Sequence, residues 1–294
     1  MNNIKKYSFN KVFKIKPQST IIQDNSINNI KQEVITLTKR LYIQLKRRPS
    51  TFIISIIQPL LWLVLFGSLF QNFPINLLTK NIQYNTFLTP GIITFTSFNG
   101  AIYAGLPLIF DREFGFLNRL IVSPLILKDS LLMSYLISIT ITSLLQTIII
   151  ILFNAYILNN TFSVCNIDII LQTIILITIG IASISISLAF ILPGHIEFLA
   201  ILLLTNLPTL FASTTLAPLS FMPYWLQILT SLNPLTYATE ILRYVSSSEF
   251  MNYKAKIIKT VWIQCSVYDS LTIILLITIV NLMITKYILK YKYE

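Results

Sequence analysis

The sequence predicts an all-α membrane protein with six transmembrane helices. Its 294 residues are 54% hydrophobic and only 11% charged, which is too apolar for a soluble fold of this length. The charged residues divide the chain into long uncharged runs, and a spanning helix needs about 20 such residues. Unbroken Ile and Leu runs also lack the apolar-out, polar-in alternation of a membrane barrel, so spanning strands are not expected.

The segment before the first span is basic. Residues 1–48 carry eleven Lys or Arg against Asp24 and Glu33, which is the positive-inside signature of a cytosolic end. Residues 1–25 predict a flexible basic tail, with a transit peptide as the alternative. In residues 26–48 apolar side chains recur at spacings of three and four, which predicts an amphipathic helix in the membrane interface. Packing of this helix on a soluble partner is the open alternative.

Six spans are expected in order along the rest of the chain, each from an uncharged run of sufficient length. They lie at about 51–70, 87–110, from Leu131 to an outer turn at Asn159, 169–192, 198–217 and 270–289. The short first loop belongs on the outer side, and the charged segment 111–130 belongs on the cytosolic side.

The run from 198 to 239 is too long for one helix. Pro218 and Pro223 should end the fifth span near Ala217, and the piece from there to Pro234 is too short to cross. A re-entrant segment on the outer side is therefore expected before the last span, with Trp225 as an interface anchor. A seventh crossing within 198–269 is the open alternative.

Sequence motifs exclude several functions. None of the seven glycines begins a phosphate-binding loop before a lysine, so this chain is expected to bind no ATP, and no other cofactor or metal is expected. No H-E-x-x-H or G-x-S-x-G motif is present, so no enzyme is predicted. The net charge of +11 is concentrated before the first span, and no nucleic-acid partner is expected.

Four further residues carry little functional signal. His195 and Glu197 lie at a predicted membrane edge, where solvated end residues are ordinary, so a proton relay is disfavoured. Cys165 and Cys265 lie a hundred residues apart in predicted outer segments, and whether they pair is left open.

The most informative stretch begins at Asp111 and ends at Pro124. It predicts a short helix between two spans, with Phe114, Leu117 and Ile121 on one face. A rod fixed at both ends to membrane helices would move when a partner docked on it moves. An ordinary polar connection is the alternative.

Two blocks resemble one known family, the ABC type-2 permeases, which are membrane subunits of polysaccharide, lipid and drug exporters. The first block contains Thr89-Pro90-Gly91, Asp111-Arg112-Glu113-Phe114-Gly115 and Val122-Ser123-Pro124-Leu125. The second contains Pro218-Leu219-Ser220-Phe221-Met222-Pro223-Tyr224-Trp225 and Leu232-Asn233-Pro234-Leu235-Thr236-Tyr237. The chain departs from the usual pattern at Asn118 and Arg119, where acidic or amide residues are common.

The resemblance implies a permease without catalysis of its own, driven by a separate ABC ATPase subunit that binds the ATP. Residues 26–48 would be a connecting helix and residues 49–294 the transmembrane domain, and two copies would pair as a homodimer around the pathway. The coupling residues would be Asp111, Arg112, Glu113, Phe114, Gly115, Leu117, Arg119 and Pro124. The outer end would be closed by a segment containing Pro218, Pro223, Trp225, Asn233, Pro234 and Tyr237.

A six-span channel or secondary carrier that works without an ATPase is the alternative function. The apolar spans favour a lipid-like, glycan-linked or amphipathic cargo. The protein itself is expected to contact membrane lipid. The abundance of Ile, Asn and Lys is typical of AT-rich genomes, and the chain resembles permeases encoded in algal plastid genomes. These features predict a plastid membrane, with a bacterial inner membrane as the alternative, and place both termini on the stromal or cytosolic side.

Overall fold

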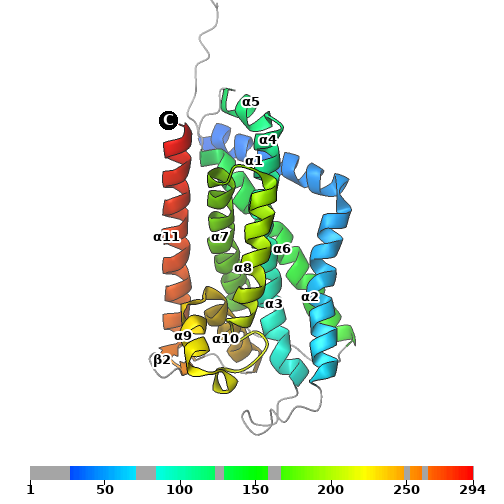
Figure 1. Ribbon diagram of the computed structural model, residues 1–294, viewed down its shortest axis with the longest axis vertical. Helices are drawn as coiled ribbons and strands as arrows, with labels where there is room; N and C mark the ends of the chain where they lie inside the picture. Colours follow the sequence, from blue (N-terminus) through cyan, green and yellow to red (C-terminus); the bar gives the residue numbers. More distant parts are fainter. Residues whose placement is uncertain are drawn as a thin grey trace, which may run out of the picture.

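The computed structural model describes residues 27–70, 84–122, 129–157, 167–247, 252–259 and 264–293. These residues form a bundle of long helices that run along a common axis, with one helix lying across its end (Figure 1). The predicted tail at 1–25 lies outside the described residues.

Within the described chain, five helical segments are long and apolar enough to cross a membrane, which confirms an all-α membrane protein. One of them is a rod in which α3, η2 and α4 follow one another without a loop. The segments are α2 (Pro49–Leu69), the rod of α3 (Tyr84–Ile102), η2 (Tyr103–Gly105) and α4 (Leu106–Glu113), α6 (Asp129–Ile157), α7 (Ile167–Ile191) and α11 (Val267–Tyr293).

The predicted fifth span at 198–217 coincides with α8 (His195–Phe211). Its 17 residues reach only about 26 Å, which is less than the hydrocarbon core. The helix ends at Phe211 and not near Ala217, because the following polar side chains bond backwards. Ser213 Oγ and Thr215 Oγ1 donate to the Leu210 carbonyl at 2.6 and 3.1 Å, and such bonds compete with continuation of a helix.

The broken segment lies at the end of the bundle opposite α1 (Figure 1). It consists of η4 (Leu219–Phe221), α9 (Tyr224–Leu232) and α10 (Pro234–Ser247). α10 packs against α3, α7 and α11, and three of its apolar side chains, at Leu235, Ala238 and Leu242, are fully buried. A small antiparallel hairpin of β1 (Lys256–Lys259) and β2 (Gln264–Ser266) follows, and the sequence did not predict it.

The centre of the bundle is formed by α7 and the α3 rod, and α2, α6 and α11 stand at the perimeter. About 67% of the apolar window of α7 and 78% of that of the rod are buried, against 17% for α2. Small and hydroxylated residues allow the close packing of α7 on α11, where Ser187 and Thr285 share a 2.8 Å hydrogen bond.

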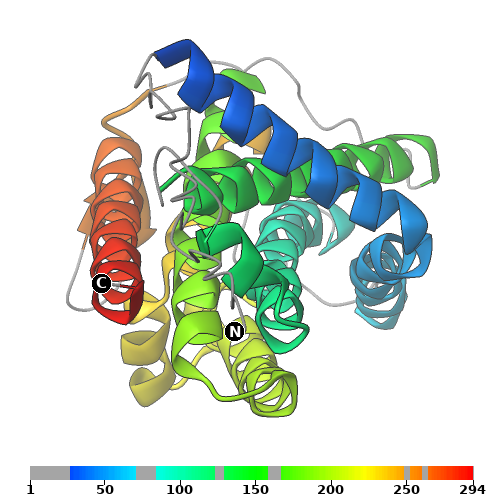
Figure 2. The same cartoon turned by 90° about the horizontal axis from the view of Figure 1, so that it is seen from above.

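α1 (Ile27–Arg47) lies across the end of the bundle and packs on α6 (Figures 1 and 2). Leu37 and Leu41 are buried, whereas Ile35 and Tyr42 on other faces are exposed. α5 (Phe116–Val122) and the end of α11 lie at the same end of the bundle as α1.

Candidate functional site

The stretch that the sequence singled out is two short helices and not one. α4 ends at Glu113, where Phe114 N donates to Phe110 O at 2.9 Å, and Gly115 N donates to Arg112 O at 3.1 Å. Gly115 has a φ of +70°, the left-handed conformation that glycine supplies at the end of a helix. The chain therefore turns at Gly115 before α5 begins at Phe116.

This turn separates the residues expected on one face. Phe114 is 77% exposed, whereas Leu117 is buried in the core cluster at 1%. Arg119 and Asn118 are exposed. Pro124 and the side chain of Ile121 lie outside the described residues. The exposed tip, which we define as Phe114, Gly115, Asn118 and Arg119, is thus a surface available to a partner.

Asp111 does not belong to the exposed tip. Its Oδ2 accepts hydrogen bonds of 2.6 Å from both Arg40 Nη2 and Tyr135 Oη, and Arg40 Nη2 also donates to Tyr135 Oη at 3.1 Å. The Arg40 guanidinium carbon lies 4.5 Å from the centre of the Phe116 ring, within the range of a cation–π interaction. Asp111 therefore connects α1, α6 and α5 to the end of the α3 rod.

Arg112 connects the same segment to α7. Its guanidinium donates to the carbonyls of Ala189 and Pro193 at 2.8 Å, to that of Phe190 at 3.3 Å, and to that of Leu192. A helix leaves its last carbonyls without partners and carries partial negative charge there, so a guanidinium stabilises this end of α7.

Glu113 connects the segment to the start of α8. Its carboxylate accepts from the backbone N of His195 at 2.7 Å, and Oε2 lies 2.7 Å from His195 Nδ1. A carboxylate at a helix N-terminus satisfies donors that the helix leaves free. The Phe110 and His195 rings are also in contact, with centroids 5.5 Å apart.

The structure therefore divides the predicted coupling residues into two groups. Asp111, Arg112 and Leu117 point into the protein, with Glu113 at its edge, and Phe114, Gly115 and Arg119 form its surface. The sequence did not identify Arg40 and Tyr135 as partners of Asp111. They lie 71 and 24 residues away along the chain on other elements, and no local pattern marks such a contact.

At the opposite end, Asn233 joins the end of α8 to the start of α10, and we call this junction the Asn233 corner. The Asn233 amide donates to the carbonyls of Thr209 and Ala212 at 2.8 and 2.7 Å, and its oxygen accepts from Leu235 N at 3.0 Å. Asn233 thereby caps α10 and satisfies the last carbonyls of α8 at the same time. Tyr237 Oη donates to Ser231 O at 2.7 Å.

The prolines fix the ends of this corner. Pro218 and Pro223 precede η4 and α9, each with extended backbone, and Pro234 is the first residue of α10. Proline is favoured at these positions because its missing N–H would have no partner within the helix. Trp225 is 63% exposed on α9, and its place at the membrane interface stays a prediction.

An ion pair at this end was missed by sequence reasoning. Arg243 and Glu240 of α10 form a salt bridge with side chains only 15% and 13% exposed. Arg243 also donates to Thr214 O at 2.8 Å, and its guanidinium carbon lies 3.7 Å from the centre of the Phe87 ring. The pair therefore joins α10, the turn after α8 and the start of the α3 rod.

Comparison with known proteins identifies a family whose sequence pattern includes both ends of the bundle. A sequence model of the family described as "ABC-2 type transporter" matches residues 32–246, which run from α1 to α10. A protein of Porphyra purpurea named "Putative transport permease ycf38" is 48% identical over 259 residues, or 88% of this chain and 89% of the relative. Proteins of the same name from Pyropia yezoensis and Cyanophora paradoxa are 51% and 44% identical, over 79% and 88% of this chain and 79% and 89% of their own lengths.

Proposed function

Because the chain belongs to the ABC-2 type transporter family, whose members are membrane transport components and not enzymes, we propose that it is the permease subunit of an ATP-driven exporter. A separate ABC ATPase subunit binds the ATP and docks on the exposed tip. Two copies of the chain pair, and the cargo passes between them. The cargo is lipid-like, glycan-linked or otherwise amphipathic.

One observation carries this proposal. Three consecutive side chains, Asp111, Arg112 and Glu113, bind α1 and α6, the end of α7, and the start of α8 respectively, while Phe114 directly after them is exposed. A force applied to the tip would reach four other helices without passing through a flexible loop. This is the mechanical property that a coupling element needs.

The finer topology is part of the same proposal. α8 together with residues 212–217 makes the sixth crossing, so that α1, the tip and the end of α11 lie on one side, as their shared end of the bundle supports (Figure 1). That side is stromal in a plastid membrane, which the resemblance to plastid-encoded permeases supports. The Asn233 corner closes the outer end of the pathway.

The experiment that tests the proposal is a pull-down of the tagged chain from its native membrane, with identification of co-purifying proteins and an ATPase assay. A soluble nucleotide-binding subunit is expected with the wild-type chain. It should be lost from Gly115→Trp and from the milder Phe114→Asp, which changes an exposed side chain.

Phe221→Asp is the matched control, because Phe221 is also an exposed phenylalanine but lies at the opposite end. ATPase recovery should be unchanged in this variant. A homo-oligomer that transports cargo and never co-purifies with an ATPase would establish the channel or carrier instead.

A further inference from the structure

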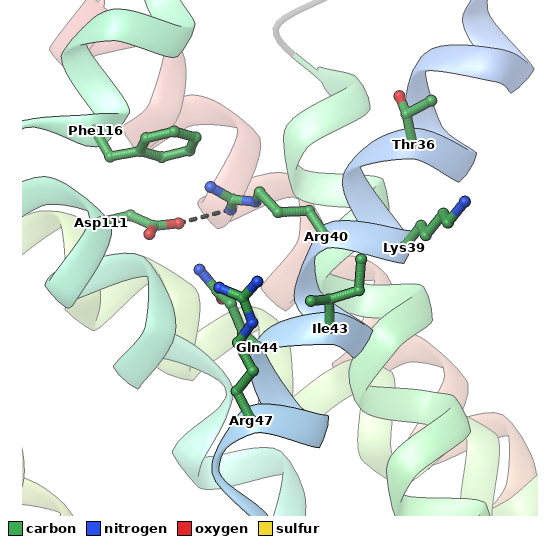
Figure 3. Close-up of a pocket in the computed structure, with 8 residues that line it drawn as sticks. All are labelled: Thr36, Lys39, Arg40, Ile43, Gln44, Arg47, Asp111 and Phe116. Atoms are coloured by element: carbon green, nitrogen blue, oxygen red, sulfur yellow. Dashed lines mark hydrogen bonds and ion pairs between the residues drawn. The ribbon is translucent and has the colours of Figure 1, made fainter.

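A cavity of about 510 Å³ lies between α1 and the start of α5. Its walls contain three cationic side chains, Lys39, Arg40 and Arg47, and one carboxylate, Asp111, a net charge of +2. Figure 3 shows the Arg40 guanidinium between Asp111 and Phe116, with the polar ends of Gln44 and Arg47 on the adjacent side of the cavity. The cavity thus has an excess of positive charge that no residue of the described ranges neutralises.

Several hydrogen-bond donors around this cavity have no acceptor among the described residues. Arg40 Nη2 donates hydrogen bonds to Asp111 and Tyr135. The Nε and Nη1 atoms of Arg40 are buried and have no acceptor in the described chain. Gln44 and Arg47, which also line the cavity, form no hydrogen bond or ion pair with a described residue. Only the Arg40 donors are buried, since Gln44 and Arg47 are exposed. Buried donors without acceptors cost free energy, and an anion in contact with Arg40 would lower that cost and offset the charge.

A second cavity, of about 510 Å³, runs along α2 and is almost wholly apolar. Its lining residues are Ile54, Ile57, Gln58, Leu61, Trp62, Leu65 and Phe66. Gln58 accepts a hydrogen bond from Asn99 at 3.3 Å, and Asp111 of the first cavity lies twelve residues further along the same rod. At about 1.5 Å per residue this is about 18 Å, close to the depth of one leaflet of a core about 30 Å thick.

The two cavities therefore match the two parts of one amphipathic molecule. We propose that the cavity of Arg40 and Arg47 binds the phosphate headgroup of an anionic membrane lipid, whose acyl chain lies along α2. Guanidinium groups suit phosphate because their donors pair with its oxygens in a fixed geometry. A free phosphate would use the first cavity alone, and an acidic protein segment would leave the apolar cavity on α2 unused.

The test measures lipid binding to the full chain in detergent, by native mass spectrometry, with phosphatidylglycerol and phosphatidylcholine of the same acyl chains as probes. Phosphatidylglycerol should bind more tightly. Arg47→Gln and Lys39→Gln should each weaken its binding about fivefold, the usual effect of one basic residue near an anionic surface. Arg47→Lys should restore part of the loss, which a general folding defect would not do.

Lys46→Gln is the matched control, because it removes the same charge from an exposed position of α1 outside the cavity. It should change binding less than twofold. Equal losses in Lys46→Gln and Arg47→Gln would mean diffuse attraction to the helix. Both lipids carry a phosphate, so equal binding of the two would show that the net negative charge of the headgroup has no role. Either result overturns the proposal.

Two further arms separate the competing occupants. Inorganic phosphate at millimolar concentration should not displace the lipid, and full displacement would assign the cavity to free phosphate. If Arg47→Gln abolished ATPase recovery but left lipid binding unchanged, the cavity would belong to the protein contact. The lipid measurement needs no ATPase, so it can fail or succeed independently of the proposed exporter function.

Discussion

Asp111 is predicted from the sequence as a coupling residue, but in the structure it is a buried residue that holds several helices together. The carboxylate is about 90% buried and its partners come from α1 and α6. A buried carboxylate needs such partners, because its desolvation is costly when it is left unpaired. In the proposed exporter, Asp111 holds the base of the tip in place, and its exposed neighbours contact the ATPase.

We expect Asp111→Asn and Arg40→Gln each to destabilise the protein by about 2 kcal/mol, because each leaves a buried polar partner unsatisfied. The double variant should lose less than the sum of the two, since the side chains act as a pair. Thermal unfolding in detergent measures all three. Asp129→Asn is the control, because the 3.2 Å pair of Asp129 with Lys286 is about half exposed and should contribute under about 1 kcal/mol. Strictly additive losses would contradict the pair.

Gly115 supports a second prediction at this scale. A Cβ at this position would meet no atom within 4 Å, so Gly115→Ala should cost only the left-handed conformation, about 1 kcal/mol. Gly115→Asn should cost less, because asparagine tolerates that region. Unfolding temperatures of the two variants test this order. A larger loss for Asn than for Ala would show that space, and not backbone conformation, limits the position.

Cys265 gives a prediction about pH. Burial, with the Asp269 carboxylate adding to it, raises the pKa of this thiol. The reactive thiolate is therefore scarce at neutral pH and forms only as the pH rises through the raised pKa, above the usual value of about 8.5. In a Cys165→Ser background, alkylation of Cys265 should be slow at pH 7 and increase at higher pH than for the exposed control Ser247→Cys. Coincident pH profiles would contradict this.

At the scale of elements, a glycine in α3 allows the backbone of the rod to pack closely against the turn that follows α8. Gly91 lies against the turn that follows α8, and a Cβ there would stand 2.4 Å from the Thr215 carbonyl oxygen. Main-chain atoms cannot move aside as the end of a side chain can, so the rod and the turn fit only with glycine at this position. The corner at Asn233 is thereby positioned by the rod whose other end carries Asp111.

Gly91→Ala should therefore destabilise the protein by about 1–3 kcal/mol, the usual cost of overpacking. Gly100→Ala on the same helix is the control, because its Cβ would meet the Gln146 Oε1 atom at 2.8 Å, and that side chain can rotate away. Thermal unfolding of both variants measures the difference. Equal losses would indicate that the turn at Thr215 adapts as easily as a side chain.

At the scale of the whole molecule, the tip and the Asn233 corner lie at opposite ends of the bundle (Figure 1). The tip, α1 and the end of α11 share one end, and α9, α10 and the hairpin share the other. An even number of crossings between α2 and α11 is the simplest path consistent with this arrangement.

Cysteine accessibility tests this arrangement in oriented vesicles, in a background of Cys165→Ser and Cys265→Ser. Phe114→Cys and Tyr291→Cys, at two exposed positions, should react with an impermeant maleimide from the same side. Trp225→Cys, exposed on α9, should react only from the other side. Labelling of Tyr291→Cys from the same side as Trp225→Cys would contradict six crossings and favour an odd number, as in the seven-span alternative.

Hydrophobic length and charge distribution by themselves determined the membrane class and placed the long helices to within a few residues. The fourth span, predicted at 169–192, is α7 at Ile167–Ile191, because an uncharged run of sufficient length has no alternative to a helix in the bilayer. The two motif blocks determined the family. Which end of the chain faces which side of the membrane rests on charge and stays a prediction.

Tertiary structure alone decided the environment of the individual side chains. Leu117 and Phe114 belong to the same local pattern, yet the turn at Gly115 buries one and exposes the other. The partners of Asp111 and Arg243 come from distant elements, and the early end of α8 depends on hydroxyl groups that bond backwards. Periodicity indicates which residues tend to be buried, but it does not show which charged side chains will pair. Pairing depends on contacts between helices that are distant in the sequence, and no single segment contains that information.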